Sequence, residues 1–175
     1  MKPEYILMIV VFAAILIGVT VSESIKKKKG SSGEDKKKIM DAAQKVLPDC
    51  AAYTIAYAQY SFRKSCGNNT TSYYYNYIAA FRPNEMVVIP IKFAGKEIVT
   101  QDHFVLDRTN VSSIKTKKGW STFFDKNGKE ICTLGVNASN ILEGKYFPLN
   151  IQQPEEAEKF RNFLDEFTKA VQPAE

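Results

Sequence analysis

Few residues in the chain have the types and spacing that catalysis or metal binding needs. The sole histidine, His103, lies beside Asp102 in the segment TQDHFVL, but no second histidine is present to complete a metal-ligand pair. The cysteines are odd in number and widely spaced, which fits neither a disulfide framework nor a zinc site. They are Cys50, Cys66 and Cys132. Cys132 alternates with apolar residues, which predicts a small core residue in a strand.

The remaining acidic and glycine-rich patterns also give no catalytic signature. Glu155, Glu156 and Glu158 stand where the first turn of a helix is expected, and negative charge stabilises that end of a helix. Phosphate-binding loops, hydrolase elbows, zinc-protease helices and dinucleotide-binding motifs are missing from the sequence. We therefore predict a non-enzymatic protein with no cofactor or metal. The alternative is an enzyme that gathers His103 and acidic residues in a concave pocket.

Lysine clusters are the second chemical feature, and their chemistry is the attraction of anionic lipid headgroups. Near a membrane each lysine contributes about 1 kcal/mol to such binding. A simpler interpretation is that the first clusters fix membrane topology and that the last is a solvated turn beside a core Trp120. The candidate lipid contacts are Lys26, Lys27, Lys28, Lys29, Lys36, Lys37, Lys38, Lys115, Lys117 and Lys118.

The net charge of +5 does not indicate a nucleic-acid-binding protein. Residues 1–38 hold eight lysines and four acids, so this short stretch accounts for +4 of the total. The rest of the chain is close to neutral, whereas nucleic-acid binding needs a basic surface on the folded domain. No nucleic-acid partner is expected.

A membrane anchor is the strongest signal in the chain. Tyr5 to Val21 is an uncharged run of 17 residues, and as a helix it would span about 25 Å, enough to cross a bilayer with help from snorkelling lysines. A buried core helix would show a polar face, which this run lacks. A cleaved signal peptide is the rival, since Thr20-Val21-Ser22 resembles a cleavage site. We predict a transmembrane anchor over residues 1–25.

The charges around this run predict its orientation. Lysines that flank a span tend to stay in the cytoplasm, and Ile25 to Lys29 reads IKKKK directly after the run. We therefore expect a single-pass protein of the cell membrane with its C-terminal domain in the cytoplasm, and a basic juxtamembrane linker over residues 26–38. The alternative is an exported or secreted domain, for which the four N-x-[ST] sequons of the chain would become relevant.

Residues 39–175 are predicted to form one β-rich domain. An amphipathic helix is expected from Asp35 to Leu47, and Pro48 ends it. Alternating segments separated by turn residues then predict a series of strands. They cover residues 51–62, 73–81, 86–93, a weaker strand from 97, 105–107, 111–117, 120–125, 130–136 and 145–149. Pro90 predicts an edge strand or a bulge, because it removes a hydrogen-bond donor.

The last element is an amphipathic helix from Pro154 to Val171, which must pack its apolar stripe against the sheet. The fold class is therefore α+β, with an antiparallel meander or partly open barrel capped by a C-terminal helix. Strands 73–81 and 86–93 should form a hairpin with a four-residue connection, and residues 126–129 should connect another. Within the first of these, Tyr73, Tyr74, Tyr75 and Tyr77 favour either an ordinary half-exposed strand or a binding face for lipid or peptide.

This order of elements resembles the pleckstrin-homology-like fold of uncharacterised single-span membrane proteins of Gram-positive bacteria. The resemblance covers about residues 73–171 and includes the segments NEMVVIPI, KKGWSTFFDKNGKEI and the terminal helix. It implies a binding or scaffolding module for a protein or lipid partner. It does not imply phosphoinositide binding, because the region of the lipid-binding pattern has only Arg82 and Lys92. The function expected from the sequence is thus a membrane-tethered binding module at the cytoplasmic face.

Overall fold

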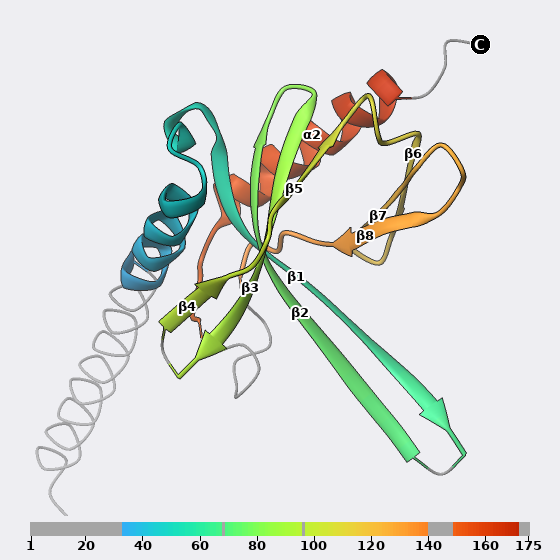
Figure 1. Ribbon diagram of the computed structural model, residues 1–175, viewed down its shortest axis with the longest axis horizontal. Coiled ribbons are helices and arrows are strands. Elements are labelled where there is room, and N and C mark those ends of the chain that lie inside the picture. The colour runs from blue at the N-terminus through green and yellow to red at the C-terminus, as the bar shows by residue number, and fades with distance from the viewer. Residues whose placement is uncertain (1–32, 68, 96, 140–148, 172–175) are drawn as a thin grey trace, which may run out of the picture.

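The computed structural model describes residues 33–67, 69–95, 97–139 and 149–171. Along the described part of the chain, eight strands follow one helix and precede another, and the hairpin of the first two strands projects away from both helices (Figure 1). After a helix over residues 33–46, the elements are η1 (Cys50–Ala52), β1 (Thr54–Cys66), β2 (Asn69–Arg82), β3 (Glu85–Ala94), β4 (Glu97–Thr100), β5 (Phe104–Asp107), β6 (Ser113–Lys117), β7 (Trp120–Phe124), β8 (Glu130–Leu134) and α2 (Pro154–Val171). The predicted α+β class with antiparallel strands is confirmed.

The larger sheet has five strands in the order β1-β2-β3-β4, with β5 also paired to β3. Pro90 lies in β3, which has partners on both sides, so the expected edge position was wrong. The predicted alternative of a bulge agrees with the structure, since the register shifts by one residue between the pairs Val88–Phe104 and Ile91–Thr100. The proline is tolerated because β5 pairs with residues 85–88 and β4 with residues 91–94, which leaves a break in the ladder between them. Only the carbonyl of Pro90 is used there, and it accepts a hydrogen bond from the Gln101 N–H at 2.8 Å.

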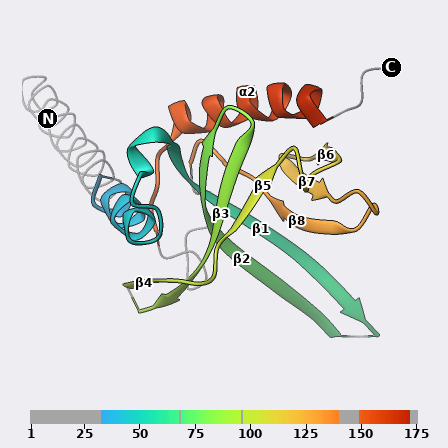
Figure 2. The same cartoon turned by 45° about the horizontal axis from the view of Figure 1, so that its top comes forward.

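A helix covers part of each face of this sheet (Figure 2). On one face, the helix of residues 33–46 packs on the strands through Ile39 and Ala43. Leu149 and Ile151 pack in the same cluster. On the other face, α2 and the three-stranded sheet β6-β7-β8 share a core that includes Phe123 and residues of α2. The buried residues of α2 are Ala157, Phe160, Phe163, Leu164 and Phe167. The strands near the helices are therefore apolar on both sides, whereas the distal half of the β1-β2 hairpin is not covered.

Within the described residues, the two sheets remain open and meet at one β-bridge. Gln59 of β1 and Gly135, just after β8, exchange backbone hydrogen bonds of 2.9 and 3.0 Å. Next to this bridge, the buried amide side chain of Gln153 takes the place of a strand. It accepts from the Tyr57 N–H at 3.0 Å and donates to the carbonyls of Tyr57 and Asn137 at 2.7 and 2.9 Å. We call these contacts of Gln59, Gly135 and Gln153 the seam.

Gln153→Leu should lower the free energy of unfolding by about 2 kcal/mol, because it leaves the buried N–H and C=O of Tyr57 without their partner. Urea denaturation of the full chain in detergent micelles measures this change. The exposed Glu158 on α2 provides the control, since Glu158→Gln should stay within about 0.5 kcal/mol of the wild type. An unchanged urea midpoint for Gln153→Leu would show that the seam does not need this amide.

The structure changes the predicted boundary between linker and domain. Residues 33–38, the described part of the predicted linker, are already helical, and Asp35 is buried. Its carboxylate accepts hydrogen bonds from the Asn150 N–H at 2.9 Å and from the Lys38 ammonium group at 2.8 Å. The folded domain therefore includes residues 33–38. Residues 26–32 and the predicted anchor, Tyr5 to Val21, lie outside the described residues, and neither described helix has the length and apolar character of a membrane span.

Most predicted strands are confirmed, with shifted ends. The β2-β3 hairpin is present, but its connection is the two residues Pro83 and Asn84 instead of four, and Asn84 has a φ of 66°. The β7-β8 hairpin turns through residues 125–129, where Gly128 has a φ of 74° and the Asp125 carboxylate accepts from two backbone N–H groups. The strand expected over residues 145–149 falls almost entirely outside the described residues.

Candidate binding surface

The most unusual feature of the surface is a row of aromatic side chains on the β1-β2 hairpin, which projects away from the helices (Figure 1). Side chains alternate along a strand, so every second residue lies on the same face of the hairpin. Near the core this face carries the buried Ala58 and Ala79, and farther out it carries aromatic residues. We call this row the aromatic face. It consists of Tyr60 and Phe62 of β1 and Tyr73, Tyr75 and Tyr77 of β2.

The rings of the aromatic face stack on one another. Phe62 and Tyr73 are cross-strand partners whose ring centroids lie 4.8 Å apart, and Tyr60 and Tyr75 are partners at 6.1 Å. Tyr75 also stacks on Tyr77 at 6.5 Å. At the base of the row, Trp120 of β7 meets Tyr60 edge-on at 5.6 Å. Aromatic pairs at such separations stabilise each other, so the face is held in a defined arrangement.

The outer part of this face is open to solvent. Phe62, Tyr73 and Tyr75 are 37%, 39% and 41% exposed, which is unusual for three neighbouring aromatic residues in a strand pair. Exposed apolar patches of this kind mark binding sites more often than scattered single residues do. The aromatic face therefore has the character of a recognition surface.

A groove of about 420 Å³ runs beside the aromatic face, between the hairpin and β8. Its walls come from β1 and β2 on one side and from β8 on the other, and Pro90 and Phe104 contribute to the lining. Glu130 is the one carboxylate among the residues that line it, and no lysine, arginine or histidine is among them. The groove offers mostly apolar contact, with hydroxyl and amide groups for orientation.

Three groups that line the groove, Cys132, Tyr77 and Tyr60, are held in their neutral form. Burial, and less strongly the nearby Glu130 carboxylate, raises the pKa of the Cys132 thiol to about 12. Burial also raises the pKa of the Tyr77 and Tyr60 hydroxyls above the ordinary value for tyrosine. At neutral pH the Cys132 thiol and the phenols of Tyr77 and Tyr60 are therefore neutral, and none of the three is an activated nucleophile.

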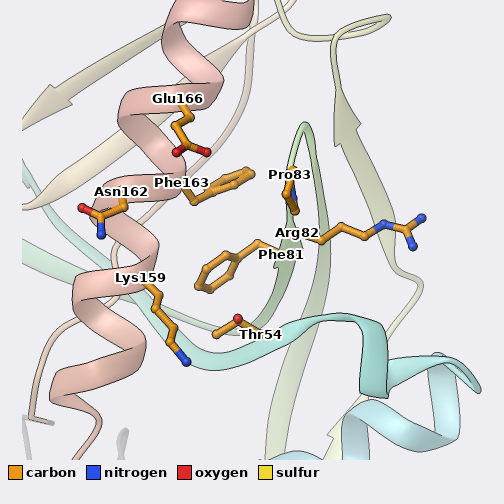
Figure 3. A pocket seen from close by; sticks show the side chains of 8 residues that line it. All are labelled: Thr54, Phe81, Arg82, Pro83, Lys159, Asn162, Phe163 and Glu166. Carbon is orange, nitrogen blue, oxygen red and sulfur yellow. The ribbon is translucent and has the colours of Figure 1, made fainter.

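A second concavity of about 200 Å³ lies between α2 and the start of the β2-β3 turn (Figure 3). Phe81 and Phe163 lie close together in it, whereas Arg82 points away (Figure 3). Arg82 is already engaged, since it lies over the ring of Tyr53 and pairs with Glu85 at 3.1 Å. This concavity has fewer open polar groups than the groove and is the weaker candidate.

The lysines proposed from the sequence do not form one patch in the described structure. Lys36 pairs with Glu156 of α2 at 2.9 Å, and Lys38 pairs with Asp35, so both ammonium groups take part in ion pairs within the domain. Lys37 is exposed on the same helix. Residues 26–29 lie outside the described residues. Lipid contact through these lysines stays a prediction.

The lysines of the β6-β7 hairpin lie on the side of the five-stranded sheet opposite to the helix of residues 33–46. Lys115 lies over the ring of Phe124, with its ammonium nitrogen 5.2 Å from the ring centroid. Lys117 and Lys118 are exposed, and Lys118 adopts a φ of 52° in the turn that leads into Trp120. Because Trp120 contacts Tyr60, this basic turn stands at the base of the aromatic face.

The other residues considered for chemistry stay apart. His103 and Asp102 are exposed in the β4-β5 connection, and neither lines the groove. Cys50 and Cys132 are buried, and Cys66 is exposed at the end of β1. Within the described ranges, no three His, Cys, Asp or Glu side chains come together as a metal site.

Sequence reasoning found three of the five residues of the aromatic face. The run from Tyr73 to Tyr77 suggested a binding face, and the structure places Tyr73, Tyr75 and Tyr77 together, with Tyr74 on the opposite side. Tyr60 and Phe62 were missed. The only sequence signal for these two residues was their alternation in AQYSF. That alternation places them beside Tyr75 and Tyr73 only once the register with β2 is known.

Comparison with known proteins gives no identification by likeness. No protein-family model, no curated protein and no solved structure matches this chain.

Proposed function

We propose that this protein is a non-enzymatic binding or scaffolding module, tethered to the cell membrane by a single N-terminal span and working at the cytoplasmic face through its aromatic face. The observation that carries this proposal is the exposed stack of Phe62, Tyr73 and Tyr75. A strand pair that ended at the core would need no such residues, because they add nothing to the packing between helices and sheets. Exposing these apolar rings to water is unfavourable, and a partner that covers them would explain why they are there.

Two features support a module of the pleckstrin-homology-like kind. Strands β1 to β4 and strands β6 to β8 each form an antiparallel meander, and the C-terminal helix covers the core between the two open sheets.

The groove lacks the charged pair or activated nucleophile that most hydrolytic and transfer reactions use, which favours binding over catalysis. Tethering rests on the uncharged run from Tyr5 to Val21 and on the lysines that follow it.

Site-specific photo-cross-linking tests the proposal. The photoreactive residue p-benzoylphenylalanine replaces Phe62, on the aromatic face, or Tyr74, on the opposite face of the neighbouring strand, in the full-length chain in cells. We expect a discrete adduct from position 62 that is absent from position 74. The double variant Tyr73→Ser/Tyr75→Ser should suppress the adduct, because it removes the rings that stack beside Phe62.

Equal adducts from positions 62 and 74, or none from position 62, would contradict a partner on the aromatic face. The same experiment in vesicles that hold no other protein identifies a lipid partner, since an adduct formed there with less than twice the mass of the chain contains lipid. An adduct of twice the mass of the chain would identify a second copy as the partner.

A further inference from the structure

The edge of β1 changes character along its length. Near the core, the backbone groups of Tyr57 that point away from β2 are hydrogen-bonded by Gln153, and those of Gln59 are hydrogen-bonded by Gly135. Backbone groups of alternate residues point to the same side of an antiparallel strand, so those of Ser61 and Arg63 point the same way. Among the described residues, no strand or side chain pairs with this edge at Ser61 or Arg63.

This unpaired edge borders the groove. Tyr60 and Phe62, which alternate with Ser61 and Arg63, are lining residues, and β8 forms the opposite wall after it diverges from β1 at the seam. An unpaired strand edge is a template for another strand, and proteins recognise extended peptides by adding them to such edges. The apolar wall beside the edge would receive every second side chain of an added strand.

Charge selects among the possible strands. Arg63 and Lys64 are exposed near the outer end of the edge. A second copy of β1 paired antiparallel about this region would bring these cations together, and like charges directly opposite each other are destabilising. Acidic side chains opposite Arg63 would instead form favourable cross-strand pairs. The edge therefore disfavours a second copy and fits an acidic segment.

We infer that the domain binds an extended peptide segment of another protein, with alternating acidic and apolar residues, which adds as a strand to residues 60–65 of β1. The acidic side chains lie on the face of Arg63, and the apolar side chains lie against Tyr60 and Phe62. This inference rests on the proposed function and names the chemical class of the partner.

The test uses the full-length chain in detergent micelles and a fluorescent peptide of alternating glutamate and valine, followed by fluorescence anisotropy. We expect saturable binding. Arg63→Glu should weaken it about fivefold and should favour a peptide of alternating lysine and valine, because the cross-strand charge is reversed. Lys37→Glu is the control, since Lys37 is also exposed but lies on the helix of residues 33–46, and it should leave binding unchanged.

Two N-methylated peptides test the backbone pairing. One is methylated on every valine nitrogen and the other on every glutamate nitrogen, so each loses the donors of one side of the strand. At least one of them should bind at least tenfold more weakly than the parent peptide. If both methylated peptides bound as tightly as the parent peptide, no backbone ladder would form and the inference would be overturned.

Absence of saturable binding by the parent peptide would also overturn the inference, as would a dimer whose two β1 edges pair with each other. Neither result alone removes the proposed function. If the adduct from position 62 persists while the peptide does not bind, the aromatic face still has a partner, but of another class.

Discussion

Phe167→Ala should lower the free energy of unfolding by about 3–5 kcal/mol, the largest effect expected from a single core substitution in this domain. Phe167 is 1% exposed, and its ring lies 5.2 Å from that of Phe163, so the smaller side chain would leave a cavity where α2 meets the sheets. Urea denaturation of the full chain in detergent micelles, followed by far-UV circular dichroism, measures the loss.

The neighbouring Glu166 is the matched control for this prediction, because it is exposed on the same turn of α2. Glu166→Ala should stay within about 0.5 kcal/mol of the wild type. If Phe167→Ala cost no more than this control, α2 would not be an integral part of the core.

Gly135→Ala should cost about 3 kcal/mol and should loosen the seam between the two sheets. A Cβ at position 135 would lie 2.4 Å from the Gly119 carbonyl oxygen and 2.9 Å from the ring of Trp120. Gly135 cannot move away from this contact without disturbing its two backbone hydrogen bonds to Gln59, so backbone atoms on both sides must shift. The substitution should change the fluorescence of Trp120 as well as the urea midpoint.

Gly33→Ala is the control for the seam, since Gly33 is helical and a Cβ there meets no atom within 4 Å. Alanine suits a helix better than glycine, so this variant should be unchanged or more stable by up to about 1 kcal/mol. Equal stability of Gly135→Ala and Gly33→Ala would show that the close approach at the seam is not needed.

The two helices were predictable because their signals are local. For α2, Pro154 and the acidic first turn mark the start, and apolar residues at helical spacing mark the buried face; the predicted bounds, Pro154 to Val171, agree with the structure. The helix of residues 33–46 begins earlier than predicted. Its first turn is fixed by the contact of Asp35 with Asn150, 115 residues away, which no local pattern reveals.

The strands were largely predictable, and so was the pairing within the β2-β3 and β7-β8 hairpins, but the other pairing partners were not. Pro90 predicted an edge strand or a bulge because a proline lacks a donor, and only the topology shows that the ladder breaks there between two partner strands. The seam depends on Gln153, which reaches Tyr57 across 96 residues of sequence. A buried glutamine that replaces a strand has no sequence signature, so the place where the sheets stay open was not foreseen.

The candidate binding surface was half predictable for a related reason. Alternation of aromatic residues is common to buried and exposed strands, so the tyrosine run alone did not distinguish a core strand from a recognition face. The distinction arises because the hairpin extends past the helices and past β8. Exposure of Phe62 and Tyr75 is a property of the tertiary structure.

The central claim, that this domain is a binding module tethered at the cytoplasmic face of a membrane, is tested most directly by protease accessibility. The full-length chain carries a C-terminal epitope tag, and protease is added either to intact cells or to inverted membrane vesicles. We predict a full-length, membrane-bound chain whose tag is protected in cells and cut in inverted vesicles. A tag that is cut in intact cells, or a shortened chain released into the medium, would contradict the claim and favour an exported domain.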